Sequence, residues 1–328
     1  MNTNIIYDVV GIGNAIVDLL AFVDDEFLTQ NKLVKGSMSL INLEDAQILS
    51  ENMTYTHITA GGSAANTMIG VSSLGGTSAF IGNVTNDEFG KLFEADMIKN
   101  NVEFELNLQN NGSPTAKCFI FITPDGERTM CTYLGAAPFV TLSAQATQLI
   151  KSSKILYIES YLLDKEETQY VIKESLKIAK DHGKKIALNL SDKFCVTRHR
   201  KFLLELIENC NIIFGNKAEM LELTENNNLE EFITKFDFDD KIFVNTLGAE
   251  GALIVKDTTR AEIEPTKTNI IDLTGAGDFF ASGFLFSHVI GGDLHRSATL
   301  GCVTASEIIS HIGTRPLIPL KQFILRYI

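Results

Sequence analysis

Positively charged residues are scarce in this chain of 328 residues. Its 28 Lys and Arg residues are outnumbered by 41 Asp and Glu residues, which leaves a formal net charge of −13 at pH 7. Nucleic acids and anionic membranes bind proteins chiefly through basic surfaces that release their counterions. The composition therefore argues against both classes of partner. It does not exclude a phosphorylated small molecule, which local N–H groups, a metal ion or a few basic side chains can hold.

Paired cysteines and long hydrophobic runs are also missing. The five cysteines (Cys118, Cys131, Cys195, Cys210 and Cys302) show no Cys-x-x-Cys spacing, which argues against zinc and is typical of reduced thiols. Apolar runs stop short of a membrane span, and no basic segment precedes an apolar one at the N-terminus. With 45% hydrophobic residues, we expect a soluble cytoplasmic protein with a real core, built as one large domain or as a domain with a smaller companion.

Several familiar ligand motifs are absent as well. Gly90-Lys91 lacks the upstream glycine of a Walker A loop, and Ile16 stands where a dinucleotide fingerprint beginning at Gly11 needs its third glycine. The six histidines (residues 57, 182, 199, 288, 295 and 311) show no metal-ligand spacing. These absences argue against a P-loop enzyme, a Rossmann dehydrogenase and a histidine metal site.

What is present is an alternation of short apolar runs with longer amphipathic ones. The short runs predict strands at Tyr7–Ile12, Thr77–Ile81, Ile155–Glu159, Lys185–Leu190, Asn211–Phe214 and Lys241–Asn245. The longer runs predict helices at Ser63–Leu74, Glu88–Asn100, Glu166–His182, Arg198–Asn209 and Lys217–Glu225. Buried strands separated by such helices form parallel sheets with right-handed crossovers. The pattern predicts an α/β fold with a doubly wound, mainly parallel sheet sandwiched by helices.

Two stretches break this alternation because no long helix separates their strands. Ile16–Phe22 precedes Gly36–Ile41, and Thr115–Thr123 is joined to Glu127–Tyr133 by the turn signal Pro124-Asp125-Gly126. We interpret residues 16–42 and 113–133 as a small β-rich lid, inserted in two pieces, that could close over a ligand and exclude water. The large domain would then comprise residues 1–15, 43–112 and 134–328.

The most informative segment is Gly275-Ala276-Gly277-Asp278, which leads into an apolar helical run. A glycine turn before a helix directs backbone N–H groups and the positive end of the helix dipole at one point, where an anion fits. The glycines allow a ligand to approach the backbone closely, and a carboxylate beside an anion is unfavourable unless it takes part in the chemistry. We favour phosphoryl transfer with Asp278 as base and Gly275–Gly277 as anion hole. The alternative is that Asp278 only caps the helix.

Other polar residues follow predicted strands, at the sheet edge where α/β proteins bind ligands. Asn14 and Asp18 come after the first strand, and Gly61-Gly62 opens the helix that carries Asn66. The paired glycines let a ligand approach the backbone, and the Asn66 amide can both donate and accept. We expect these residues to bind substrate.

Two further strands are followed by candidate nucleotide ligands. Asn216 and Glu219 come after the strand that ends at Phe214, and Glu219 is suited to hold a hydrated Mg²⁺ ion. Thr246, Gly248 and Gly251 follow the next strand and could seat nucleotide phosphates or ribose.

Taken together, these segments resemble the ribokinase-like (PfkB) family of sugar and nucleoside kinases. The matching segments are Gly11-Ile-Gly13-Asn14, Gly61-Gly62, Asn216-x-x-Glu219, Gly275-Ala-Gly277-Asp278 and Gly313-Thr-Arg-Pro316, which span nearly the whole chain. Within the family, the segments that look like adenosine kinases are Gly13–Asp18, Asn189-Leu-Ser191, Phe214-Gly215-Asn216 and Tyr157-Ile-x-x-Tyr161.

The resemblance implies ATP- and Mg²⁺-dependent phosphorylation of the 5′-hydroxyl of adenosine. Asp18, Gly62 and Asn66 would hold the ribose, Asp278 would take the hydroxyl proton, and Gly275–Gly277 would stabilise the transferring phosphoryl group. Asn189 joins the nucleotide-binding residues. The alternatives are another nucleoside or a free sugar, as in ribokinases and fructokinases, or a binding protein without turnover. An exposed lid could drive the formation of a homodimer.

The remaining positions have two readings each. Tyr161 matches a position that lines the base pocket of adenosine kinases, and the lid residues Phe119, Phe121, Leu40 and Leu134 could add to that pocket or serve only packing. Arg128 could reach the phosphates or be an exposed turn residue. Asp272 and Thr274 resemble the monovalent-cation loop of the family, where K⁺ would bind, but they could equally serve only to shape the turn.

Overall fold

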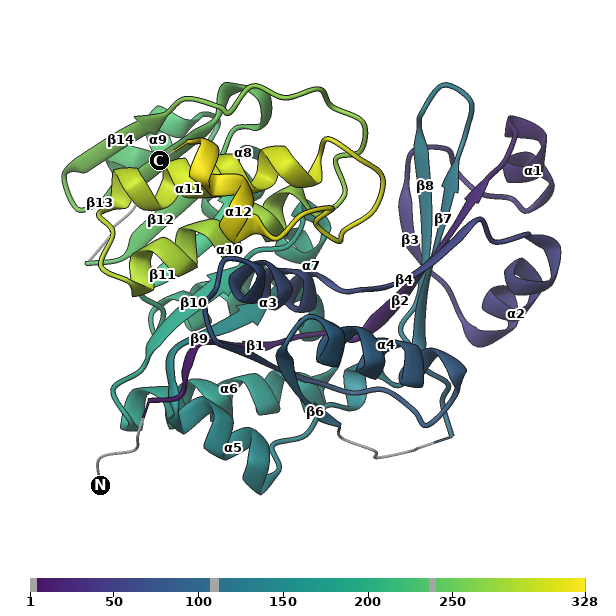
Figure 1. Cartoon of the computed structure of the whole chain (residues 1–328), viewed down its shortest axis with the longest axis horizontal. Coiled ribbons are helices and arrows are strands. Elements are labelled where there is room, and N and C mark those ends of the chain that lie inside the picture. The colour runs from purple at the N-terminus through teal and green to yellow at the C-terminus, as the bar shows by residue number, and fades with distance from the viewer. Residues whose placement is uncertain (1–4, 107–111, 236–239, 328) are drawn as a thin grey trace.

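The computed structural model describes residues 5–106, 112–235 and 240–327, and its strands form two separate sheets. In Figure 1 the large sheet carries helices on both of its faces, and the smaller sheet stands beside it with two short helices on its outer side. No helix within the described residues is long and apolar enough to cross a membrane.

The large sheet confirms the predicted α/β fold. Seven neighbouring strands are parallel, and β13 pairs antiparallel with β12 and with β14 in a hairpin at one edge. The order across the sheet is β14 (Thr259–Ile263), β13 (Ala252–Lys256), β12 (Ile242–Thr246), β11 (Ile212–Asn216), β10 (Lys185–Asn189), β9 (Ser153–Glu159), β1 (Tyr7–Ile12), β5 (Ser78–Gly82) and β6 (Val102–Leu106).

Helices cover both faces of this sheet because alternate strand residues on each side are apolar. One face packs on α3 (Ser63–Ser73), α4 (Glu88–Lys99), α10 (Ala276–Val289) and α11 (Leu294–Ile308). The other packs on α5 (Ala144–Lys151), α6 (Glu166–Asp181), α7 (Lys193–Ile207), α8 (Lys217–Thr224) and α9 (Leu229–Lys235). Helix α12 (Leu320–Phe323) packs against α3 and α11. Helix α7 begins before its predicted start at Arg198, because Asp192 caps it by accepting the Cys195 N–H at 2.7 Å.

The strand order reverses between β1 and β9. The chain first adds β5 and β6 on one side of β1 and then returns to add β9 to β12 on its other side. The connections that leave β1 and β9 therefore diverge and open a crevice beyond the carboxyl ends of these strands. Ligands of α/β proteins bind at such a point.

The small sheet contains the four strands expected for the lid and one more. Its order is β3 (Met38–Leu40), β8 (Arg128–Tyr133), β7 (Ala116–Ile122), β2 (Ile16–Phe22) and β4 (His57–Gly61), with α1 (Asp25–Gln30) and α2 (Leu43–Asn52) beside it. The sequence interpretation placed residues 57–61 in the large domain. That assignment was wrong for β4, which pairs antiparallel with β2, Asp18 lying opposite Thr59. Strand β4 lies at the edge of the small sheet, and its sequence His-Ile-Thr-Ala-Gly contains no run of apolar residues.

Parity along β7 decides which side chains face the large domain. Cys118, Ile120 and Ile122 share one face of the small sheet. Phe119 and Phe121 lie on the other face, fully buried, and Phe121 packs on Phe27 of α1 with ring centroids 5.1 Å apart. Neither of these two phenylalanines can therefore line a pocket between the sheets.

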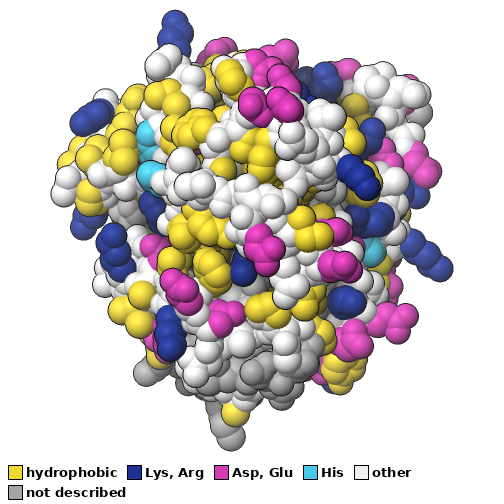
Figure 2. Space-filling model, turned by 90° about the vertical axis from the view of Figure 1, so that its right-hand side faces the viewer, with side chains coloured by type: hydrophobic (Ala, Val, Ile, Leu, Met, Phe, Trp, Pro, Cys, Tyr) yellow, Lys and Arg dark blue, Asp and Glu magenta, His cyan; other side chains and the backbone are white. Residues whose placement is uncertain are grey.

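Hydrophobic side chains are exposed on the outer side of the small sheet. Figure 2 looks onto this side and shows several hydrophobic patches interspersed with charged groups. Val34, Ile48 and Ile58 are exposed residues of this part of the chain. The suggestion of a homodimer stays a prediction.

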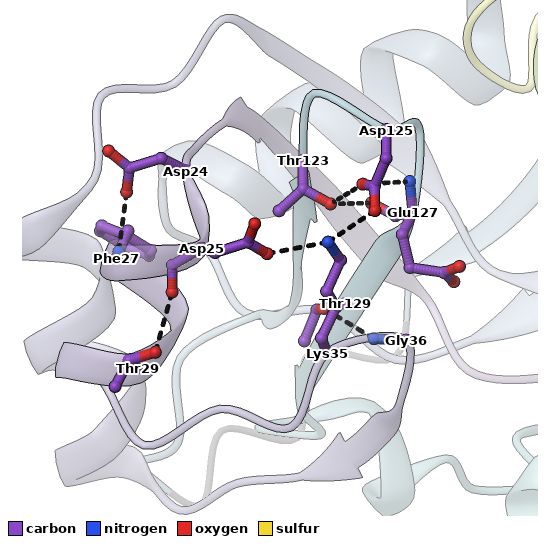
Figure 3. A network of polar contacts seen from close by, with 10 residues as sticks. All are labelled: Asp24, Asp25, Phe27, Thr29, Lys35, Gly36, Thr123, Asp125, Glu127 and Thr129. Atoms are coloured by element: carbon purple, nitrogen blue, oxygen red, sulfur yellow. Dashed lines mark hydrogen bonds and ion pairs between the residues drawn. The ribbon is translucent and has the colours of Figure 1, made fainter.

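The tip of the β7–β8 hairpin is tied to the segment between α1 and β3 (Figure 3). Lys35 Nζ lies 2.8 Å from Asp25 Oδ1 and 2.6 Å from Asp125 Oδ2. Asp125 also accepts the Thr123 hydroxyl at 2.6 Å, and Thr129 Oγ1 accepts the Gly36 N–H at 3.0 Å. These contacts hold the turn between β7 and β8 against residues 25–36.

We predict that Lys35→Met loosens this hairpin locally. Amide hydrogen exchange over residues 123–129 should become faster, because the Lys35 ammonium is the cation that joins Asp25 to Asp125. The urea midpoint should hardly change, since exposed ion pairs contribute little to global stability. Lys32→Met, at an exposed position of the same segment, is the control, and equal exchange rates in both variants would contradict the prediction.

Candidate active site

A cavity of about 560 Å³ lies between the small sheet and the carboxyl ends of strands β1, β9, β10, β11 and β12. The structure brings most of the predicted site residues together on its wall. These are Asn14, Asp18, Gly62, Asn66, Arg128, Tyr161, Asn189, Asn216, Glu219, Thr246, Thr274, Gly275, Ala276, Gly277 and Asp278. Gly61, Gly248, Gly251 and Asp272 are not among the lining residues.

Asp278 lies in the first turn of α10, with its carboxylate held by two side chains of α3. Ser63 Oγ donates to Asp278 Oδ1 at 2.7 Å, and Asn66 Nδ2 donates to Asp278 Oδ2 at 2.9 Å. The residue at the N-cap position is Gly275. The reading of Asp278 as a mere helix cap is therefore wrong, because its oxygens are used by another helix.

Its surroundings make Asp278 a stronger base than a free aspartate. Burial raises the pKa of Asp278 to about 6, and the hydrogen bonds from Asn66 and Ser63 and the Arg315 charge limit that rise. The carboxylate is thus ionised at neutral pH, with a pKa close enough to the working pH for general-base catalysis.

The two glycines of the turn differ in why they are needed. Gly275 has φ +79°, and a Cβ there would lie 3.0 Å from Thr314 Cγ2, so its own backbone demands glycine. A Cβ on Gly277 would meet no atom within 4 Å, and Gly277 faces the cavity. The Ala276 N–H donates to Leu273 O at 3.2 Å, so it is already engaged. Room for a ligand is the remaining reason for Gly277.

Two side chains at the start of the small sheet present polar atoms without protein partners. Asn14 is buried, and neither its amide oxygen nor its amide nitrogen has a hydrogen-bond partner in the described residues. No hydrogen bond to the Asp18 carboxylate is found there either, and burial raises the pKa of Asp18 to about 7. Gly61 makes room for this carboxylate, since a Cβ there would lie 2.3 Å from Asp18 Oδ2. Buried polar atoms of this kind fit a polar ligand.

Sequence reasoning missed Glu159, the last residue of β9. Its carboxylate accepts the backbone N–H groups of Asn14 and Ala64, both at 2.7 Å. Glu159 thereby ties the end of β1 to the start of α3, and burial raises its pKa to about 7. Its place at the carboxyl end of a strand beside the reversal of strand order was the available signal. Ser63 was also missed.

On the nucleotide side, several predicted ligands already form hydrogen bonds with other protein groups. Asn216 and Glu219 form a capping box at the start of α8, in which Glu219 Oε2 accepts the Asn216 N–H at 2.9 Å and Asn216 Oδ1 accepts the Glu219 N–H at 3.0 Å. Burial raises the pKa of Glu219 to about 7. Asn189 Nδ2 donates to Tyr157 Oη at 2.9 Å. Their roles toward a nucleotide stay predictions.

The glycines after β12 lie away from the cavity wall. Gly251 has φ +87°, and a Cβ there would lie 2.0 Å from Ile263 O of β14, so the hairpin itself requires glycine. Gly248 is exposed with open space beside it, and Thr246 lines the cavity. Phosphate binding by this loop stays a prediction.

The wall opposite Asp278 is largely apolar. Ile16, Leu40, Ile120, Met130 and Leu134 line it. Of the four lid residues that had two readings, Leu40 and Leu134 lie on the cavity wall, whereas Phe119 and Phe121 pack on the other face of the small sheet. Both faces of β7 are apolar, so the sequence could not show which one turns to the cavity.

Tyr161 lies in the turn after β9, and its hydroxyl donates to Ser191 O at 3.3 Å. Beside it the cavity wall carries an ion pair that sequence reasoning missed, between Arg198 Nη2 and Asp164 Oδ1 at 3.0 Å. His199 Nε2 also lies 2.8 Å from Asp164. This end of the cavity thus combines one aromatic ring with a charged rim.

Arg128 reaches from the small sheet to the glycine turn. Its Nη2 lies 2.7 Å from Asp272 Oδ2, and Nη1 donates to Thr274 Oγ1. Asp272 also accepts the N–H groups of Thr274 at 2.7 Å and Gly313 at 2.9 Å. Burial alone would raise the pKa of Asp272, but these donors and the Arg128 charge hold it below its usual value. Whether K⁺ or a phosphate joins these residues stays a prediction.

A divalent metal would find few protein ligands here. Within residues 5–106, 112–235 and 240–327, no group of three or more His, Cys, Asp and Glu side chains could hold a metal ion. Glu219 is the buried carboxylate on the nucleotide side of the cavity. One carboxylate acting through water is enough for Mg²⁺ when substrate phosphates supply the other ligands.

Comparison with known proteins assigns the family. The pfkB family carbohydrate kinase model matches residues 32–321. Adenosine kinase from Sinorhizobium meliloti is 38% identical, with a TM-score of 0.90 over 98% of this chain and 99% of that one. A probable sugar kinase from Rhizobium etli CFN 42 is 36% identical, with a TM-score of 0.90 over 98% of both chains. Adenosine kinase of Saccharomyces cerevisiae is 28% identical over 92% of this chain and 94% of its own.

The fold and the site thus define a kinase that phosphorylates a hydroxyl group of a small molecule. The chain belongs to the pfkB family of carbohydrate kinases, which includes nucleoside kinases. ATP is the phosphoryl donor that this family implies.

We predict that Gly277→Ala separates folding from catalysis. The free energy of unfolding should stay the same or rise by up to about 1 kcal/mol, because alanine suits a helix better than glycine. Phosphoryl transfer should fall by roughly tenfold or more, because the new methyl group enters the cavity beside the reacting groups.

Gly275→Ala is the matched control for this variant. It should lose about 1–2 kcal/mol of stability because its φ is positive. Urea denaturation and steady-state kinetics measure both effects, and full activity of Gly277→Ala would contradict the account of the turn.

Proposed function

We propose that this chain transfers the γ-phosphoryl group of ATP to the 5′-hydroxyl of adenosine, giving AMP and ADP. The observation that carries the proposal is the position of Asp278. Its carboxylate stands at the start of α10, held by Ser63 and Asn66, and lines a cavity whose opposite wall is apolar. A base, an anion site and an apolar surface thus share one cavity.

The chemical step follows from this arrangement. The 5′-oxygen forms a bond to the γ-phosphorus while the bond from that phosphorus to the β–γ bridging oxygen breaks, and ADP leaves. The hydroxyl proton passes to the Asp278 carboxylate late in the reaction. Charge spreads over the equatorial oxygens of the transferring group, where the helix dipole and the N–H groups that follow Ala276 at the start of α10 favour it.

A nucleoside accounts for the apolar wall better than a free sugar does. Leu40, Leu134 and Tyr161 line the cavity, and these side chains gain most when an apolar ring face covers them. A free sugar carries a hydroxyl on nearly every carbon and offers no such face.

Asp18 and Asn14 suit the ribose. A carboxylate accepts from both hydroxyls of a cis-diol, and the Asp18 carboxylate has no hydrogen-bond donor among the described residues. The Asn14 amide offers a free donor and a free acceptor. The Asn66 amide is engaged on both sides already, by Asp278 and by Arg315, so only its remaining hydrogen or lone pair could serve a ribose hydroxyl.

ATP would occupy the other side of the cavity. Asn189, Asn216 and Thr246 line that side, and Glu219 would hold Mg²⁺ through water. When bound, Mg²⁺ neutralises phosphate charge and orients the transferring group. Arg128, which now pairs with Asp272 and Thr274, lies close enough to the turn to contact a phosphate.

A free sugar is the second candidate. The probable sugar kinase from Rhizobium etli matches this chain as well as the bacterial adenosine kinase does, and the Asp164–Arg198 ion pair gives one end of the cavity a polar rim. The catalytic step would be unchanged, because only the group that carries the hydroxyl differs.

The direct test of the substrate is ADP release from Mg²⁺–ATP. Adenosine, inosine, guanosine, cytidine, ribose and fructose are offered side by side at equal concentration. We expect strong turnover with adenosine only. Turnover of ribose or fructose without adenosine would replace the nucleoside assignment by the sugar alternative, and no turnover with any acceptor would refute the proposal.

We predict that Asp278→Asn lowers kcat by about 10²–10⁴-fold while adenosine binds nearly as tightly as before. The amide keeps the size of the side chain but cannot accept the proton. Steady-state kinetics and calorimetric titration measure the two quantities. Lost binding with unchanged kcat would instead make Asp278 a structural residue.

A further inference from the structure

Arg315 belongs to the Gly313-Thr-Arg-Pro316 segment, to which the sequence analysis assigned no role. Its guanidinium group lies beneath the site, and the side chain is only 20% exposed. Nε and Nη2 both lie 2.7 Å from Asp96 Oδ2 of α4. Nη2 also donates to Ala60 O of β4 at 2.8 Å, and Nη1 donates to Asn66 Oδ1 at 2.8 Å. One cation thus joins α4, β4 and α3.

The contact with Asn66 determines which way the amide points. A guanidinium can only donate hydrogen bonds, and an ionised carboxylate can only accept them. Asn66 lies between the two, with Oδ1 toward Arg315 and Nδ2 toward Asp278 Oδ2 at 2.9 Å. Both partners favour the same orientation, because turning the amide would direct Oδ1 at the Asp278 carboxylate and Nδ2 at the guanidinium.

Arg315 also provides positive charge where negative charge accumulates. The titratable and charged groups around Asp278 are Asp18 on β2, Tyr157 and Glu159 on β9, Tyr161 in the following turn, and Arg315. Arg315 is the cation that lowers the pKa of both Asp278 and Asp18, against the burial that raises them. Of these two carboxylates, Arg128 lowers the pKa of Asp18 only.

We propose that Arg315 is a positioning residue for phosphoryl transfer, which holds the Asn66 amide with its NH₂ group toward Asp278 and places a positive charge beside that carboxylate. The inference rests on the proposed function, because it assigns Arg315 to the base of that reaction. Arg315 touches neither reacting group itself and acts through Asn66.

The experiment compares Arg315→Met and Arg315→Lys with the wild-type chain between pH 5 and pH 9, using whichever acceptor the wild type turns over. Arg315→Met should lower kcat at pH 7 by roughly 10- to 100-fold, with little change in KM. The acidic limb of its profile of kcat against pH should move to higher pH. The Arg315 charge lowers the carboxylate pKa, so its removal raises that pKa and leaves more of the base protonated at a given pH.

Arg315→Lys restores the charge but not the fork of donors. Its acidic limb should stay near that of the wild type, with kcat between those of the wild type and Arg315→Met. Asp96→Asn is the structural control, since it breaks the ion pair on α4 but leaves the Arg315–Asn66 hydrogen bond. Its acidic limb should not move.

A measurement that requires no turnover tests the role of Arg315 independently of the proposed function. In protein labelled with ¹³C at aspartate carboxyl groups, Asp278→Asn identifies the Asp278 signal, and that signal should titrate at higher pH in Arg315→Met. Arg315→Gln replaces Arg315→Met if the latter does not fold. An unmoved titration, or a variant that loses stability but keeps the wild-type kcat and pH profile, would make Arg315 a structural anchor only. A wild type without turnover on any acceptor would refute the proposed function alone.

Discussion

The site depends on holding several carboxylates close together at one cavity. Asp18, Glu159 and Asp278 all border one cavity, and burial raises the pKa of each. Burying a charge is costly unless hydrogen bonds or opposite charge compensate for it. The donors that compensate come from the end of β1, the first turns of α3 and the segment around Arg315. The fold around the cavity therefore places hydrogen-bond donors next to these carboxylates.

This requirement explains why distant parts of the chain meet at one point. Glu159 accepts N–H groups from β1 and α3 at the place where the strand order reverses. Asp272 accepts N–H groups from the turn and from the loop after α11, and pairs with Arg128 of the small sheet. A substrate that fills the cavity adds hydroxyl donors to the same carboxylates. Binding and catalysis thus use the polar groups whose burial the fold leaves incompletely compensated.

The sequence predicted what is encoded locally. Alternating runs indicated the parallel sheet, and the glycine turn before an apolar helix indicated Asp278, because strand period and helix start are local properties. The roles of Glu159 and Arg315 were not predicted, because their hydrogen-bond partners lie 145 and 249 residues away in the sequence. The sequence left two readings for Phe119 and Phe121 because both faces of β7 are apolar, and β4 was not predicted because His-Ile-Thr-Ala-Gly contains no run of apolar residues. The capping box at Asn216 and Glu219 is local, but the same sequence pattern is also expected for a pair of ligand-binding residues.

The central claim is that Asp278 accepts the proton of the reacting hydroxyl. A crystal structure with adenosine and a non-hydrolysable ATP analogue tests it most directly. The account predicts the 5′-oxygen within about 2.6–3.2 Å of the Asp278 carboxylate, with the γ-phosphate facing the N–H groups at the start of α10. A complex in which Asp278 contacts only Ser63 and Asn66, with the nucleoside hydroxyl held elsewhere, would contradict it.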